Sequence, residues 1–194
     1  ALALHRVEGA RFATAAFLNL SRDHLDFHGD ERLYFAAKAR LFESLSQREC
    51  AVLPADAPYG ERVKALTEAR MLTFGRSAAA DVRLREERCG LEGSSAILDT
   101  PDGPLPVRTF LLGRFNLDNV AAAAACAVAQ GLPPDCITSG VLSLDRIPGR
   151  VERIECGQPF CVVVDYAHTD AALRQLLRSL RALTSGRLSV LFGC

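Results

Sequence analysis

The chain has 194 residues, of which 49% are hydrophobic, and its 23 Lys and Arg balance its 23 Asp and Glu. This balance argues against nucleic acid or an acidic membrane surface as a partner held by general charge attraction. No apolar run reaches the roughly 18 residues of a membrane span. The seven scattered cysteines are typical of a reduced, cytoplasmic protein, and we expect Cys126, Cys136 and Cys161 in its core.

The first 75 residues alternate between strand-like and helix-like patterns. Continuous apolar runs predict buried parallel strands, and apolar residues three and four apart predict helices. Asp30 stands where a helix N-cap is expected. The alternation indicates an α/β sheet. The expected elements are strands over 13–20, 50–54 and 71–75 and helices over 30–45 and 58–69.

Residues 81–112 change character. Three short strand-like segments are separated by turn signals such as TPDGP, which predicts a small antiparallel insertion. Two helices follow, over 115–130 and 133–144, and the first is expected to stop at Gly131.

The segment RIPGR, 146–150, is a Pro/Gly breaker that predicts a domain boundary, with one domain over 1–147 and the next over 148–194. Beyond it we expect a strand over 160–168, a helix N-capped by Thr169, and a strand over 187–193. The predicted fold class is therefore α/β. A mostly parallel sheet flanked by helices carries the small antiparallel insertion, and the β-α-β start of a second Rossmann-like α/β domain follows.

A polar loop, SRDHLDFHGD, follows the first predicted strand. Ligands in α/β sheets gather at the carboxyl ends of strands. The side chains of Asp23, His24, Asp26 and His28 are therefore candidate metal ligands. The alternative is a polar loop that only caps the following helix.

Lys38 lies in the middle of an apolar helix stripe, YFAAKARLF, although the chain has only one other lysine, Lys64. A buried ammonium is costly. The side chain can reach solvent, pair with a buried acid, or become a neutral amine that takes up carbon dioxide as a carbamate. A carbamate supplies carboxylate-like oxygens, which suit a hard cation such as magnesium.

Two further groups of residues are candidate ligand contacts. Asn116 and Asn119 lie one turn apart at the start of an apolar helix, where they can contact a base or an anion or can simply cap the helix. Arg150 follows the breaker, and Asp165 and His168 follow a predicted strand. This arrangement fits a phosphate site, or else a salt bridge between domains.

Five segments in this order resemble one family, the ATP-dependent Mur ligases of peptidoglycan synthesis, and above all its MurE-type branch, which extends UDP-N-acetylmuramoyl-L-alanyl-D-glutamate. The resemblance spans essentially the whole chain and is weakest over 76–112. Leu4 and Asp170 depart from the branch's pattern. The segments are NLSRDHLDFHG, YFAAKARLF, GRFNLDNVAAA, RIPGRVE and VVVDYAHT.

The resemblance implies a site. Lys38 as its carbamate and His24 would hold Mg²⁺ and, with Arg150 on a phosphate, would form the catalytic set. Asn116 and Asn119 would contact ATP.

The resemblance also implies that the second domain contributes Asp165, Tyr166 and His168 to the nucleotide site, and that Arg6 touches the UDP-muramoyl-dipeptide. The implied reaction adds meso-diaminopimelate or L-lysine through an acyl-phosphate, in an enzyme that is monomeric at full length.

The chain contains no GxxGK[ST] phosphate loop, which the family carries. We therefore expect the 194 residues to be part of a longer protein and to be inactive by themselves. Two other functions stay open: another ligase of the superfamily, such as a folylpolyglutamate synthetase, and a non-catalytic nucleotide-binding module.

Overall fold

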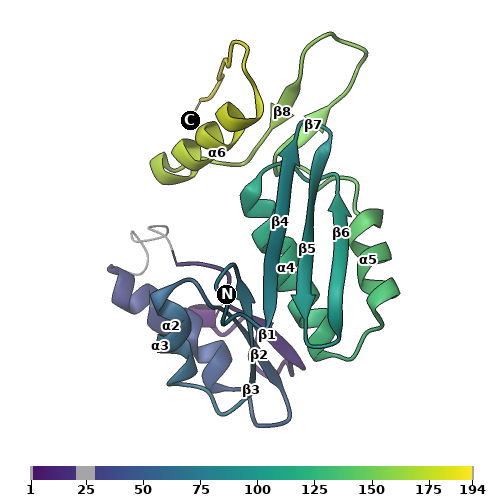
Figure 1. Cartoon of the computed structure of the whole chain (residues 1–194). Coiled ribbons are helices and arrows are strands. Elements are labelled where there is room, and N and C mark those ends of the chain that lie inside the picture. Colours follow the sequence, from purple (N-terminus) through teal and green to yellow (C-terminus); the bar gives the residue numbers. More distant parts are fainter. Residues whose placement is uncertain (1, 21–28, 194) are drawn as a thin grey trace.

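The computed structural model describes residues 2–20 and 29–193. A six-stranded sheet with helices on both faces forms the larger part, and a two-stranded sheet with one helix follows (Figure 1). The larger sheet is parallel from β1 to β4 and antiparallel from β4 to β6. Its strands in order are β1 (Thr14–Ala16), β2 (Cys50–Pro54), β3 (Arg70–Gly75), β4 (Val82–Gly90), β5 (Gly93–Thr100) and β6 (Gly103–Thr109).

Strand β2 is buried along its whole length because both of its faces are covered. Cys50 and Val52 belong to the core beneath α4 (Arg114–Ala129). Ala51 and Leu53 belong to a second core with α2 (Glu31–Glu43) and α3 (Pro58–Lys64). Alternate residues of a strand point to opposite faces, so the continuous apolar run CAVLP fills both cores. This confirms the predicted parallel α/β sheet.

The antiparallel hairpins β4–β5–β6 were expected as a small insertion. Their antiparallel pairing is confirmed, and they also continue the central sheet, since β4 pairs in parallel with β3 through Phe74 and Val82. Helix α5 (Pro134–Ser143) packs beside β6 and supports this end of the sheet. The local turn signals gave the hairpins but carried no information about which strand they would join.

The C-terminal part contains β7 (Glu152–Ile154), β8 (Val162–Val164) and α6 (Asp170–Leu183). The two strands pair antiparallel. The strand expected over 187–193 is a wrong prediction, because this segment forms no strand and Leu191 is 99% exposed. A strand needs a hydrogen-bonded neighbour, and the described residues offer it none.

Predictions that rested on local chemistry were confirmed. The Asp30 side chain accepts the Leu33 N–H at 2.8 Å, and the Thr169 hydroxyl accepts the Ala172 N–H at 3.3 Å.

The helix expected over 58–69 ends early, at Lys64. Beyond that end, the Thr67 hydroxyl donates a hydrogen bond to the Phe42 carbonyl, and the segment does not continue the helix.

The cysteine prediction was correct in part. Every cysteine that the structure describes is free, in keeping with a reduced protein. Cys126 is half-buried beneath the sheet, but Cys136 and Cys161 are exposed and do not belong to the core. Among the described residues, no helix is both long enough and apolar enough to cross a membrane.

Two helical glycines make a matched test of how tightly α3 lies on the end of β2. A Cβ on Gly60 would collide with the Pro54 carbonyl oxygen, whereas a Cβ on Gly140 in α5 would meet nothing within 4 Å. We expect Gly60→Ala to lower the free energy of unfolding by about 1–3 kcal/mol through overpacking. Gly140→Ala should raise it by about 0.5–1 kcal/mol through helix propensity. Urea denaturation measures both, and equal effects of the two substitutions would contradict the close packing.

Candidate functional site

Lys38 lies beside the carboxyl end of β1. Its ammonium donates a hydrogen bond to the Asn19 carbonyl at 3.1 Å. The same Nζ lies 4.8 Å from the centre of the Tyr34 ring and 5.6 Å from that of Phe17. A carbonyl dipole and two aromatic faces all favour a cation. The side chain is therefore half-buried in a defined place at a strand end, where α/β proteins bind ligands.

The predicted metal ligands cannot be placed. Asp23, His24, Asp26 and His28 lie outside the described residues. Within the described ranges, no group of three or more His, Cys, Asp or Glu is arranged to hold a metal ion. What the structure does place is Lys38, beside Asn19, near the end of the described range 2–20.

The two predicted asparagines have different environments. Asn116 is buried, and its Nδ2 donates to the Leu112 carbonyl at 2.8 Å. Asn119 is exposed and donates to the Asn116 Oδ1 at 3.1 Å. Asn116 therefore ties the loop before α4 to the helix, although it does not cap the helix. Asn119 leaves its Oδ1 on the surface, where a ligand can reach it.

Arg150, Tyr166 and His168 form one exposed row. The Arg150 guanidinium lies 5.2 Å from the Tyr166 ring centre, and the Tyr166 and His168 rings are 5.0 Å apart, edge to face. The His168 Nδ1 is 3.0 Å from the Tyr166 carbonyl oxygen. A cation beside two aromatic rings can contact both the phosphate and the base of a nucleotide.

The Asp165 carboxylate accepts hydrogen bonds from two backbone N–H groups. Its Oδ2 accepts the Val151 N–H and its Oδ1 accepts the Ala167 N–H, each at 2.8 Å. Val151 is buried and has a φ of 49°, a strained conformation for a β-branched residue. Asp165 thus holds the strained turn that presents Arg150, and both carboxylate oxygens are engaged.

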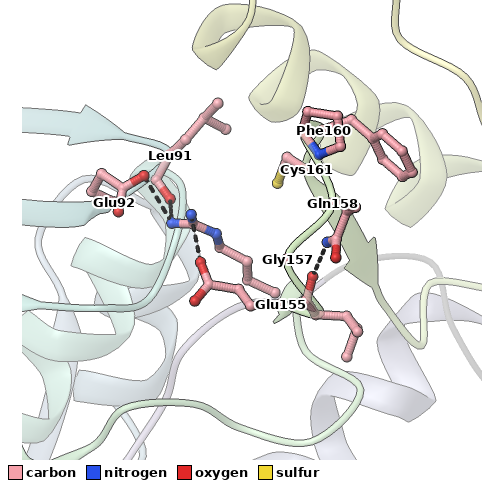
Figure 2. A pocket seen from close by; sticks show the side chains of 10 residues that line it. Leu91, Glu92, Glu155, Gly157, Gln158, Phe160 and Cys161 are labelled. Carbon is pink, nitrogen blue, oxygen red and sulfur yellow. Dashed lines mark hydrogen bonds and ion pairs between the residues drawn. The ribbon is translucent and has the colours of Figure 1, made fainter.

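The β7–β8 hairpin contacts the β4–β5 turn through Arg153. Its guanidinium donates to the Leu91 carbonyl at 2.7 Å and pairs with Glu92 at 3.0 Å and Glu155 at 2.5 Å. Figure 2 shows Leu91 and Glu92 facing the loop from Glu155 to Cys161 across a pocket of about 400 Å³. No predicted site residue lines that pocket.

A neighbouring cavity of about 420 Å³ does include Arg150, together with Arg108 and Arg146. Arg6 lies apart from these residues in sequence, exposed just after the turn η1 (Leu2–Leu4), which packs against α2. Apart from Arg6, the predicted residues that the structure describes therefore fall into three groups: Lys38 at β1, the asparagines on α4, and the Arg150 row.

Sequence reasoning missed a fourth group, an ion-pair network between β3, β4 and α4. Arg76 Nε and Nη2 donate to the two Glu87 oxygens at 2.7 and 2.6 Å, and its Nη1 pairs with Asp118. Arg114 lies 3.4 Å from Glu87. The only sequence signal was an acid between the two asparagines in NLDN.

Burial and pairing shift the pKa values within this network. The hydrogen bonds from Arg76 hold the pKa of Glu87 below its ordinary value, and the bond to Glu87 raises the pKa of Arg76. Burial raises the pKa of Asp118, and the Arg76 charge opposes that rise. At neutral pH the Arg76–Glu87 pair is therefore charged on both sides.

The Mur ligase middle domain matches residues 1–127, and the Mur ligase glutamate ligase domain matches residues 149–194. The chain belongs to the Mur ligase family. The proposed boundary at residue 147 falls between these two matches but stays a prediction.

Curated relatives of this Mur ligase chain carry the name UDP-N-acetylmuramoyl-L-alanyl-D-glutamate–2,6-diaminopimelate ligase. The protein of Geobacter metallireducens is 42% identical over 200 aligned residues, which cover 100% of this chain and 39% of the relative. The Bacillus velezensis protein is 41% identical, covering 100% of this chain and 41% of its own length. This chain therefore spans about 40% of the length of these relatives.

Solved structures agree on the fold. A structure titled as a UDP-N-acetylmuramoyl-L-alanyl-D-glutamate–2,6-diaminopimelate ligase superposes with a TM-score of 0.78 at 34% identity, over 100% of this chain and 40% of that one. MurF from Acinetobacter baumannii gives 0.80 at 22% identity, over 89% and 38%. The second likeness bears on the fold alone.

The Arg76–Glu87 pair makes a testable contribution to stability. We expect Glu87→Gln to lower the free energy of unfolding by about 1–3 kcal/mol at pH 7, because it removes the charge from a hydrogen-bonded pair in which Glu87 is only 18% exposed. A lowered folded-state pKa means that this stabilisation is lost as pH falls through that value. The cost of the substitution should therefore shrink below about pH 4.

The matched control is Glu86→Gln. Glu86 is the neighbouring residue, but it is 64% exposed, and its contact with Arg85 is longer, at 3.4 Å, than that of Glu87 with Arg76. Chemical denaturation at pH 7 and at pH 3.5 compares the two variants. Equal costs for both at pH 7, or a Glu87→Gln cost that does not fall with pH, would contradict this account of the network.

Proposed function

We propose that this chain is part of an ATP-dependent ligase that adds 2,6-diaminopimelate to UDP-N-acetylmuramoyl-L-alanyl-D-glutamate in peptidoglycan synthesis. The observation that carries the proposal is the similarity of 41–42% identity along the entire chain to relatives with that name. These names favour diaminopimelate over L-lysine, which the sequence had left open. The reaction would take place in the cytoplasm, and we propose a monomer at full length.

The proposed reaction has two steps. A D-glutamate carboxylate oxygen attacks the γ-phosphorus of ATP, which forms an acyl-phosphate and releases ADP. The diaminopimelate amine then attacks the acyl carbon, loses a proton, and expels inorganic phosphate as the amide forms. Both steps move negative charge between oxygens, so cationic groups placed around the phosphoryl group would supply much of the catalysis.

Lys38 would act as its carbamate. The ammonium first loses a proton, the lone pair of the neutral amine then bonds to the carbon of CO₂, and a second proton leaves nitrogen, so that a cation becomes an anion. As it stands, a Lys38 ammonium held by a carbonyl and two rings does not fit a metal ion. The carbamate does fit, because it supplies carboxylate-like oxygen at a strand end. With His24 it would hold Mg²⁺, which when bound would neutralise charge on the transferred phosphoryl group.

The nucleotide would lie between α4 and the Arg150 row. Asn119 has an exposed amide oxygen for a base, and Arg150 has a guanidinium for a phosphate. Tyr166 and His168 would supply aromatic faces beside the nucleotide. Asn116 and Asp165 would support this site from behind, since their side chains bond mainly to the protein. Arg6 would contact the UDP-linked substrate.

Other superfamily activities have less support. The likeness to Lactobacillus casei folylpolyglutamate synthetase, titled L. casei FPGS, has a TM-score of 0.72 but only 20% identity, which bears on the fold alone. A non-catalytic nucleotide-binding module is the remaining alternative, and the experiment below separates it from the diaminopimelate ligase.

The test is phosphate release by the complete protein that contains this chain. We would supply ATP, magnesium, UDP-N-acetylmuramoyl-L-alanyl-D-glutamate and meso-diaminopimelate, and omit each in turn. We expect release that requires all four, with L-lysine a poor replacement for diaminopimelate. Equal rates with L-lysine would overturn the choice of amino acid. A folded protein that binds ATP but releases no phosphate with either amino acid would overturn the proposal and favour the folate-type ligase or the binding module.

A further inference from the structure

We propose that Arg76 is a positioning residue for the nucleotide site, because it joins the second turn of α4 to the end of β3 and to Glu87 of β4. The inference rests on the proposed function in one respect: Asn119 on that turn is taken to contact the nucleotide. Arg76 itself would not touch the ligand. Its role would be to hold the ligand-binding turn in place before the ligand arrives.

The backbone of Arg76 is itself fixed. Its N–H donates to Asp56 Oδ2 at 2.5 Å, and the next N–H, that of Ser77, donates to Asp56 Oδ1 at 2.8 Å. The preceding Gly75 has a φ of 152°, and a Cβ at that position would collide with the Asp56 carboxylate. The Arg76 side chain therefore starts from a well-defined point at the carboxyl end of β3.

Glu87 reaches Arg76 because β4 contains a bulge. Arg85 pairs with Ile97 and Arg88 pairs with Ser95, so Glu86 and Glu87 together oppose the single residue Ala96. Glu86 absorbs the extra residue with a φ of 51°. Ala96 belongs to the core beneath α4, so the bulge turns Glu87 onto the α4 face. A strained backbone that places one carboxylate is typical of a functional constraint.

The start of α4 lacks a side-chain cap. Helices α2 and α6 begin with a side-chain N-cap, but the N-cap position of α4 is Gly113, which makes no side-chain cap bond. Asp118 lies in the second turn of α4, next to Asn119, and pairs with Arg76. The ion pair therefore anchors the second turn of α4 to the sheet, close to its uncapped end.

The network is neutral as a whole, which favours a structural link over an anion site. Two arginines, Arg76 and Arg114, face two acids, Glu87 and Asp118. Without Arg76, the two carboxylates would share only the long contact from Arg114. Their repulsion would then push the second turn of α4 away from β4.

The experiment compares Arg76→Met with Arg85→Met in the complete protein. Arg85 lies on β4, close to Glu87 in sequence, and also binds a carboxylate through two nitrogens, that of Asp99. Within the part of the chain that the structure describes, its hydrogen bonds and ion pairs reach Asp99 and Glu86 but no residue of α4. We expect Arg76→Met to raise the KM for ATP roughly tenfold with kcat within about twofold, the pattern of lost positioning. Arg76→Lys should lie between, and Arg85→Met should match the wild type.

A second readout does not depend on activity. Amide hydrogen exchange over residues 115–119 in the nucleotide-free protein should be faster in Arg76→Met and unchanged in Arg85→Met. A folded Arg76→Met protein with wild-type KM for ATP and wild-type exchange would overturn the inference. A fall in kcat at constant KM would also overturn it.

Two further outcomes stay interpretable. If Arg76→Met does not fold, Asp118→Asn tests the same link with little change in shape, and it should raise the KM for ATP and speed exchange to a smaller extent. Normal values for both in a folded Asp118→Asn protein would overturn the inference. If the wild type shows no ligase activity, the proposed function fails, but exchange over 115–119 still decides whether Arg76 orders that turn.

Discussion

The close packing of α4 on the sheet is the constraint on which the rest of the structure depends. Four alanines, Ala121, Ala122, Ala124 and Ala125, are each no more than 2% exposed, and α4 contacts every strand from β1 to β5. A side chain that ends at Cβ lets the helix lie close to the strands. The residue that packs the helix also favours its formation. Because the body of α4 is packed closely on the sheet, the position of its N-terminal turns relative to the strand ends is fixed.

Charged residues gather at the carboxyl ends of the parallel strands and beside the N-terminal turns of α4. Lys38 is held at the end of β1 and Arg76 at the end of β3, both at carboxyl ends of parallel strands. In α/β sheets this edge binds ligands, since the connections leave it open. Arg76 is neutralised within the protein, whereas among the described residues Lys38 contacts a carbonyl and two aromatic rings. Lys38 is therefore the cation for which we propose a chemical reversal of charge.

Local chemistry predicted much of the fold. The run CAVLP predicted both ends of β2 correctly, and Asp30 and Thr169 were identified as helix caps. Each of these features depends only on residues that are close together in the sequence. Pairing between distant segments was not predictable. The strand expected over 187–193 lacks a partner, and Glu87 reaches Arg76 only through a bulge. Spacing put Asn116 and Asn119 on one face, but only packing against the Leu112 loop decides which of the two is buried.

The central claim is that Lys38 carries a carbamate. The most direct measurement is a ¹³C NMR spectrum of the complete protein in ¹³C-bicarbonate, compared with its Lys38→Met and Lys64→Met variants. The account predicts a carbamate carbon resonance in the wild type and in Lys64→Met, and none in Lys38→Met. A folded wild-type protein without the resonance at saturating bicarbonate, or a resonance that persists in Lys38→Met, would contradict it.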